Sequence, residues 1–299
     1  MAVGITLSTS DQVGATLLPI LRERGFEETE RPGALRRRGV YLIVVEEPIV
    51  PTGRYGVAGQ PYPIDYDAAA ETLGIEYYVI AYRHASKSGK PCLTVHASGN
   101  FGEALYGGRP RELQRVAARP MRSVFLRLRE EPPEGYAVSL EATHHSPTGF
   151  RTPMFFAEIG STEKQWRDEA AAEHLAAAIL EGVASVEDVP AALGFGGGHY
   201  CPRFTELEAE MAFGHICPKY ALDLLDEGLI QQMVERTVDG VELAILDRGM
   251  KGRHRRRIEE GWAWSLRGGD PGLQGFEAPL VALLPDALQQ PLSQLLLEA

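Results

Sequence analysis

The chain has 299 residues, of which 44% are hydrophobic and 24% are charged, and this composition excludes a disordered protein and a collagenous or coiled-coil rod. Its formal net charge of -11 disfavours non-specific binding to nucleic acid unless positive charge is gathered locally. Three cysteines are too few for a disulfide framework, and no leader or membrane span is recognisable, so we expect a cytoplasmic protein that does not associate with membranes.

Alternating strands and helices are predicted along the first two thirds of the chain. Five short apolar runs predict strands, each followed by a loop rich in Gly, Ser, Pro or Asn, at 41–45, 76–81, 91–96, 136–141 and 154–159. Helical stretches are predicted at 13–24, 113–129 and 162–181, the last with Ser161 as its N-cap. This alternation indicates a layered α/β sheet whose ligands collect at the strand ends.

The C-terminal part has a different composition. Beyond Gly249 the chain becomes basic and then apolar with interrupting prolines. We therefore predict an α/β catalytic domain over residues 1–245 and a C-terminal extension over 246–299 that packs on the same domain.

Histidines are concentrated where chemistry is expected. Six of the eight fall in predicted loops or at strand ends, namely His84, His96, His144, His145, His199 and His215. We expect no catalytic role for His174 or His254. Imidazoles that converge from several loops can hold a divalent metal, most often zinc, and the same groups serve as general acids and bases near neutral pH. The residue pattern leaves both uses open.

The adjacent pair His144 and His145 restricts the local geometry. Neighbouring residues of an extended segment point to opposite faces, so both imidazoles enter one pocket only if the chain turns, and Ser146-Pro147 can supply that turn. In an extended segment Glu141 would instead share a face with His145 and orient its ring.

Glycines and cysteines near residue 200 suggest two further possibilities. The backbone N–H groups of Gly196, Gly197 and Gly198 can bind an anion or a developing oxyanion, although the segment lacks the Lys-Ser or Lys-Thr of a phosphate loop. His-x-Cys also occurs twice, which raises the alternative of a structural zinc site with unusual ligand spacing, formed by His199, Cys201, His215 and Cys217.

Several segments together resemble the archaeal and plant type of D-aminoacyl-tRNA deacylase. They are 84–89, 93–96, 99–100, 107–108, 141–145 with 147–148, 158–163 with Trp166, 196–200, and 214–215 with 219–220. The resemblance implies a three-layer α/β/α fold with a mixed sheet, similar to the core of nucleoside phosphorylases and peptidyl-tRNA hydrolases. It also implies zinc dependence and hydrolysis of the ester between a D-amino acid and tRNA. Ser146 and Cys201 depart from the family pattern.

The resemblance and the residue pattern together assign roles to particular side chains. The expected catalytic residues are His144, His145, His199 and Glu141. The expected metal ligands are His96, His144, His199 and Glu158. The expected substrate-binding residues are His84, Asn100, Gly196, Gly197, Gly198, Tyr200 and Lys219. Zinc is the expected cofactor and D-aminoacyl-tRNA the expected partner of a monomeric protein.

Arginines predict how an acidic protein would dock tRNA. On a helix, Arg111, Arg115, Arg119 and Arg122 would line one face at spacings of four, four and three. A second basic cluster contains Arg253 and Arg255. Guanidinium groups suit phosphate well, so both clusters are candidate tRNA-binding surfaces.

Two other functions remain open at this point. One is a metal-dependent amidohydrolase or peptidase that acts on a small substrate, and the other is a non-catalytic RNA-binding module. A covalent mechanism through Cys92 is disfavoured because this thiol lies in an apolar strand pattern.

Overall fold

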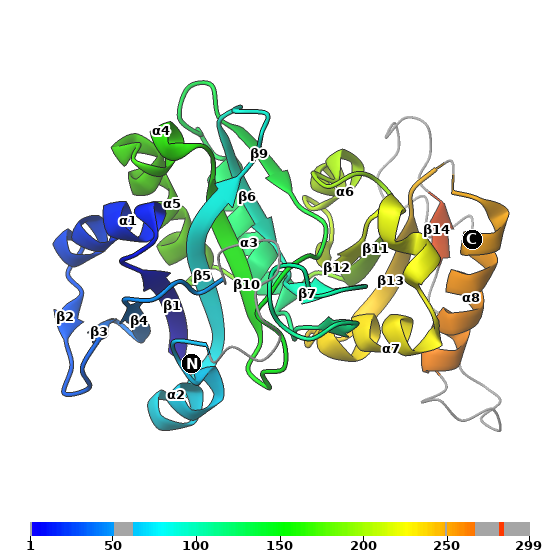
Figure 1. Ribbon diagram of the computed structural model, residues 1–299, viewed down its shortest axis with the longest axis horizontal. Helices are drawn as coiled ribbons and strands as arrows, with labels where there is room; N and C mark the ends of the chain where they lie inside the picture. Colours follow the sequence, from blue (N-terminus) through cyan, green and yellow to red (C-terminus); the bar gives the residue numbers. More distant parts are fainter. Residues whose placement is uncertain (1, 51–61, 249, 267–280, 284–299) are drawn as a thin grey trace.

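A computed structural model of the protein describes residues 2–50, 62–248, 250–266 and 281–283. Two sheets lie side by side, a large one of eight strands and a smaller one of four (Figure 1). No helix in the described parts of the chain combines the length and the apolar character needed to cross a bilayer.

The large sheet is mixed, with the strand order β2-β3-β4-β1-β5-β10-β6-β9. Its strands are β1 (Ala2–Ser8), β2 (Glu27–Glu28), β3 (Ala34–Arg37), β4 (Val40–Val45), β5 (Ile75–Ala85), β6 (Cys92–His96), β9 (Ala137–Leu140) and β10 (Met154–Ser161). The central strand β5 runs parallel to β1 and β10, whereas β6 runs antiparallel to β10. All five strands predicted from the sequence are present.

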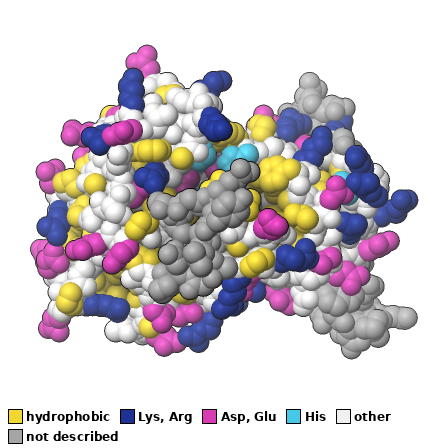
Figure 2. All heavy atoms as spheres, in the orientation of Figure 1, with side chains coloured by type: hydrophobic (Ala, Val, Ile, Leu, Met, Phe, Trp, Pro, Cys, Tyr) yellow, Lys and Arg dark blue, Asp and Glu magenta, His cyan; other side chains and the backbone are white. Residues whose placement is uncertain are grey.

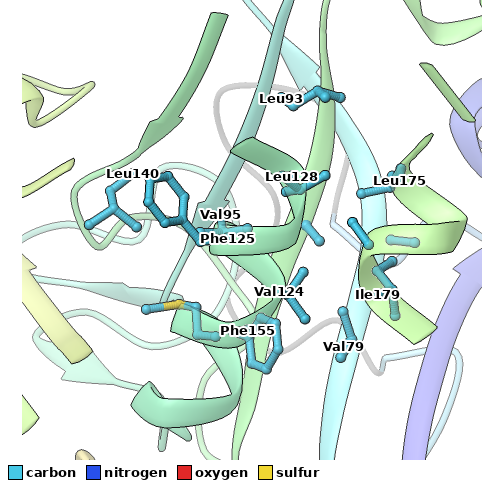
Figure 3. Close-up of a cluster of buried hydrophobic side chains, with 14 of the residues drawn as sticks. Val79, Leu93, Val95, Val124, Phe125, Leu128, Leu140, Phe155, Leu175 and Ile179 are labelled. Carbon is cyan, nitrogen blue, oxygen red and sulfur yellow. The ribbon is translucent and has the colours of Figure 1, made fainter. Parts of the chain in front are cut away.

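Helices cover both faces of the large sheet. They are α1 (Gln12–Glu23), α2 (Tyr66–Leu73), α3 (Ala118–Arg129), α4 (Glu163–Trp166) and α5 (Glu169–Gly182). Side chains of β5 alternate between the two faces of the sheet. Val79 packs in the core with α3 and α5 (Figure 3), whereas the neighbouring Tyr78 packs with Tyr66 of α2 on the other face. The predicted three-layer α/β fold is therefore confirmed.

Two of the predicted helices differ from the structure. The stretch predicted as one helix over 162–181 is two helices, because Asp168 interrupts it and caps α5 through the backbone N–H groups of Ala170 and Ala171. Thr162, rather than Ser161, caps α4 together with Gln165. The helix predicted over 113–129 begins only at Ala118.

The smaller sheet was not predicted from the sequence. Its order is β12-β11-β13-β14, and its paired strands are parallel, with bounds β11 (Ala191–Phe195), β12 (Ala212–Cys217), β13 (Val241–Leu246) and β14 (Val281–Leu283). The surrounding elements are α6 (Pro202–Leu207), the 3-10 helix η1 (Lys219–Leu224), α7 (Glu227–Arg236) and α8 (Gly252–Leu266). A short pair, β7 (Gly99–Asn100) with β8 (Glu112–Leu113), lies outside both sheets.

The C-terminal region is continuous with this smaller unit. β13 spans the predicted boundary at 245, α8 packs against α7, and the buried Trp262 belongs to the same core as Phe195 of β11. The division into residues 1–245 and 246–299 stays a prediction. Residues 267–280 and 284–299 of the expected extension lie outside the described residues.

Candidate active site

Seven ionisable side chains gather where the two sheets meet, and they come from three strands of the large sheet and from two loops that follow strands. Strands β5, β6 and β10 of the large sheet place His84, His96 and Glu158. The loops after β9 and β11 place the others, which are Glu141, His144, His145 and His199. In the space-filling view histidine side chains reach the surface, with apolar side chains beside them on the side of the smaller sheet (Figure 2).

The loop after β9 joins the two sheets. The backbone N–H of Glu141 donates to Val95 O of β6, and that of Thr143 donates to Ile216 O of β12. The chain then turns, with a positive φ of 46° at His145. The rings of His144 and His145 consequently lie 4.3 Å apart in one cluster, which confirms the expected turn. The extended alternative, with Glu141 orienting His145, is wrong.

Three histidines form a group suited to a metal ion. One ring nitrogen from each of His96, His144 and His145 lies within 4.8 Å of the others. Their Nδ1 atoms contact backbone carbonyls, at 3.1 Å for His96, 2.8 Å for His144 and 2.6 Å for His145. A carbonyl oxygen only accepts, so Nδ1 carries the proton in the neutral ring and Nε2 presents a lone pair. The Nε2 of His96 is buried without a hydrogen-bond partner, as a metal ligand would be.

A second group centres on Glu141. Its Oε1 lies 3.0 Å from His84 Nδ1 and its Oε2 lies 3.0 Å from His199 Nε2. Both carboxylate oxygens are buried, and neither approach is aligned as a hydrogen bond. Glu158 Oε2 lies 3.6 Å from both His84 Nδ1 and His96 Nε2, so it connects the two groups.

Burial and mutual contact determine the charges of the cluster. Burial opposes ionisation of Glu141, but His199 and His84 outweigh it and hold the pKa of this carboxyl well below its usual value. Burial and the neighbouring His96 lower the pKa of His145 to about 4, and burial with His96 and His145 lowers that of His144 strongly. At neutral pH the carboxylate is therefore ionised, and these two imidazoles are neutral and able to act as ligands.

The remaining histidines lie outside the cluster. His215 is fully buried in β12, and its Nδ1 lies 3.2 Å from the side-chain oxygen of Thr143. It therefore supports the loop after β9, which joins the two sheets. His174 contacts Leu128 O and His254 contacts Asp223, as expected for residues without a role in chemistry.

The structural-zinc alternative is wrong. His199, Cys201, His215 and Cys217, all among the described residues, do not form a group with converging ligand atoms. The thiol of Cys201 donates to the carbonyl of Gly198, and Cys217 is buried in the core of the smaller sheet.

Some of the expected substrate-binding residues have structural contacts instead. The N–H of Gly196 donates to Cys217 O at 2.8 Å, so it is not available to an oxyanion. The side-chain amide of Asn100 donates to the carbonyls of Gly107 and Arg109 and fixes that loop. The hydroxyl of Tyr200 lies 2.9 Å from His84 Nε2, beside the cluster. Lys219 is exposed at the start of η1.

Two cavities open on the cluster and share Tyr106, His144, His145 and His199. The larger, of about 750 Å³, extends over the 99–111 loop and η1. The smaller, of about 410 Å³, extends toward His84 and Glu158. The three shared histidines therefore border both cavities.

The prediction that four arginines line one exposed helix face is wrong. Arg111, with φ 53°, precedes β8, and Arg115 precedes the first residue of α3, so neither lies on that helix. Arg119 pairs with Asp188 and donates to Val189 O. Arg122 is only 4% exposed and donates to the backbone carbonyls at 208 and 209. Arg253 and Arg255 are exposed on α8.

Comparison with known proteins matches most of this chain to one family. The sequence model of the family described as D-aminoacyl-tRNA deacylase matches residues 72–263. A D-aminoacyl-tRNA deacylase of Methanosarcina mazei is 44% identical over 204 residues, which are 66% of this chain and 67% of the relative. One of Thermococcus kodakarensis is 40% identical over 196 residues, 63% of this chain and 72% of the relative. The crystal structure of a conserved protein of unknown function is 29% identical, with a TM-score of 0.77 over 88% of this chain and 93% of that one.

Proposed function

The chain belongs to the D-aminoacyl-tRNA deacylase family, and from this we propose that it hydrolyses the ester that joins a D-amino acid to tRNA. The products are the free D-amino acid and tRNA. The single observation that carries the proposal is that all seven residues of the histidine and glutamate cluster fall inside the matched range. A non-catalytic RNA-binding module would have little use for such a cluster.

We further propose that the cluster holds zinc through the Nε2 atoms of His96, His144 and His145. The Nε2 of His96 makes no hydrogen bond, and Glu158 Oε2 lies 3.6 Å from it. This and the three Nδ1 contacts to carbonyls support the assignment. Of the ligands expected from the sequence, His96 and His144 belong to this group, whereas His199 lies with Glu141 and Glu158 lies between the groups. When bound, zinc would supply Lewis acidity that polarises the ester carbonyl and favours ionisation of the attacking water.

The proton transfers are assigned to His199. Its side chain is 34% exposed, whereas Glu141 at 3.0 Å is completely buried. His199 can therefore meet a water at the cavity, while the ionised carboxylate orients its ring and stabilises the imidazolium that forms. As the water oxygen bonds to the carbonyl carbon, His199 takes a proton. It then gives that proton to the ribose oxygen as the ester C–O bond breaks.

The oxyanion that develops on the ester carbonyl requires hydrogen-bond donors near the cluster. With the Gly196 N–H committed to Cys217 O, the backbone groups of Gly197 and Gly198 remain the proposed donors from this loop. Tyr200 is the proposed substrate-binding group. Its hydroxyl lies 2.9 Å from His84 Nε2, and its ring centroid lies 5.2 Å from that of His199, which supports this assignment.

A single-turnover comparison tests this function. The zinc-loaded protein should release the amino acid from D-tyrosyl-tRNA and leave L-tyrosyl-tRNA essentially intact, and chelation should abolish release. Equal rates on both substrates would contradict chiral selection, and cleavage of small amides or peptides alone would favour the amidohydrolase alternative. Full activity after verified zinc removal would leave histidine acid-base chemistry without a metal.

A further inference from the structure

Three exposed, bulky apolar side chains surround the larger cavity. Tyr106 is 47% exposed, Tyr220 66% and Leu224 44%. Among the described residues, the other exposed large hydrophobic side chains are Val186 and Val238, which line a different cavity. Apolar side chains that are scattered singly need no explanation, but three around one opening beside reactive histidines indicate a binding surface.

Both segments that carry these side chains are held in place. In η1, Ala221 and Leu222 are buried in the core of the smaller sheet, so the same short helix must project Tyr220 and Leu224 outward. The loop that carries Tyr106 is fixed by the amide of Asn100. Because the backbone that carries the two tyrosine rings is already anchored, these segments lose little conformational entropy when a ligand binds.

Arginines converge at the end of η1, beside Leu224. Arg111 donates to Leu224 O at 3.1 Å and pairs with Asp226 at 2.5 Å. Arg253 pairs with Asp223, and Arg257 donates to the carbonyls of 223 and 225. Asp223 and Asp226 balance part of this charge, and both are exposed, so a phosphate can compete with them for the guanidinium groups. Glu103 is a carboxylate of the cavity wall and is also exposed.

The proposed substrate has two different parts, one on each side of the carbonyl carbon that reacts. The ester oxygen belongs to the ribose of the 3′-terminal nucleotide, so the nucleoside and the amino acid lie on opposite sides of the carbonyl that the histidines must reach. The two cavities share the three histidines at 144, 145 and 199 and the ring of Tyr106, so they meet at the reactive histidines, as such a divided substrate requires. The larger one carries Tyr220, whereas the smaller one is lined by charged groups including Arg83 and Glu158.

On the basis of the proposed function, we propose that the larger cavity binds the 3′-terminal adenosine of tRNA. The purine stacks on Tyr220 and Tyr106, and Arg111 faces the phosphate chain that leads away from it. The smaller cavity then receives the aminoacyl group. Stacking between a base and an aromatic ring tolerates any base, because every base presents a π-face, so the expected signature is dependence on the presence of the base.

Uncharged RNA provides a test that does not depend on hydrolysis. Two labelled acceptor-stem minihelices are compared by fluorescence anisotropy, one ending in CCA and one with an abasic terminal nucleotide. The wild-type protein should bind the abasic RNA about five- to a hundredfold more weakly, the range expected for loss of one stacked base. Tyr220→Ala should bind the CCA form weakly and show little further loss with the abasic form.

Matched variants separate stacking from general damage. Tyr220→Phe keeps the ring and should retain the abasic penalty, and Val186→Ala removes an exposed apolar side chain elsewhere and should behave as wild type. An unchanged penalty in both Tyr220→Ala and Tyr106→Ala, or no penalty in the wild-type protein, would overturn the inference. A clear penalty in a protein that cleaves no D-aminoacyl-tRNA would contradict the proposed reaction and leave the nucleoside site standing.

Discussion

The Nε2 atom of His199 lies 3.0 Å from a buried oxygen of Glu141, and this contact joins the loop after β11 in the smaller sheet to the loop after β9 in the large one. One partner is partly exposed and the other is completely buried. The pair therefore combines access to solvent with an ionised group that water does not screen, so the carboxylate strongly attracts the imidazolium that forms when His199 takes a proton.

If this pair acts as a unit, the effects of its two substitutions will not add. We expect Glu141→Gln and His199→Ala each to lower kcat about a hundredfold or more, the scale of losing a positioned acid or base. The double variant should be no slower than the slower single variant. His174→Ala, which removes only a contact to Leu128 O, should retain normal turnover. Reductions that multiply in the double variant would show that the two residues act independently.

Zinc affinity tests the three-histidine group. His96→Ala and His145→Asn should each weaken zinc binding at least about a hundredfold, because even partners that only orient a ligand are worth ten- to a hundredfold. Asn is chosen at residue 145 because it tolerates the positive φ of 46° there. The zinc content after dialysis against a graded chelator gives the result, with His174→Ala as the control. Wild-type retention in both ligand variants would remove this group as the zinc site.

The sequence predicted the central strands well because branched and aromatic residues form continuous runs there. It missed β11, because Ala and Gly, which make up much of this strand, are depleted in strands generally. The structure explains that composition, since a Cβ at Gly194 would lie 3.0 Å from Ile216 of the neighbouring strand. The prediction of a helix from residue 113 also overlooked Pro120. Proline is tolerated in the first turn of a helix, so its position indicates that α3 begins only shortly before it.

The candidate site was predicted in composition but not in its pairings. The turn at Ser146-Pro147 was readable, and it brings His144 and His145 together. The contacts of Glu141 with His84 and His199 depend on strand order and on how the two sheets meet, which no local pattern encodes.

A buried carboxyl far from the chemistry should make stability depend on pH. Glu208 is fully buried, one oxygen accepts from the Phe213 N–H, the other has no partner, and burial raises the pKa well above its usual value. Folding therefore favours the protonated form, while the unfolded carboxyl ionises above its ordinary pKa. The contribution of protonated Glu208 to the free energy of unfolding is complete at pH values below the ordinary carboxyl pKa. It is lost as the pH rises from there toward the pKa in the folded protein.

Glu208→Gln removes this pH dependence while keeping the acceptor for Phe213. Its advantage in unfolding free energy over the wild type should grow by about 1.4 kcal/mol per pH unit between about pH 5 and the folded pKa. Denaturant unfolding at a series of pH values measures the gap. The exposed Glu134→Gln should stay close to wild type throughout. A constant gap for Glu208→Gln would show that this carboxyl is already ionised in the folded protein.

Salt dependence distinguishes arginines that face RNA from those that hold the fold. Arg111 and Arg253 have side chains 44% and 56% exposed, whereas Arg122 is buried against backbone carbonyls. The double variant Arg111→Gln/Arg253→Gln should weaken tRNA binding and flatten the log-log salt slope by about 0.7 to 0.9 for each phosphate that is no longer bound. Arg122→Gln should leave the slope unchanged and lower the unfolding free energy by about 1–3 kcal/mol, because the carbonyls at 208 and 209 lose their donor. A slope that flattens in Arg122→Gln but not in the double variant would place the RNA on α3, against the burial of that guanidinium.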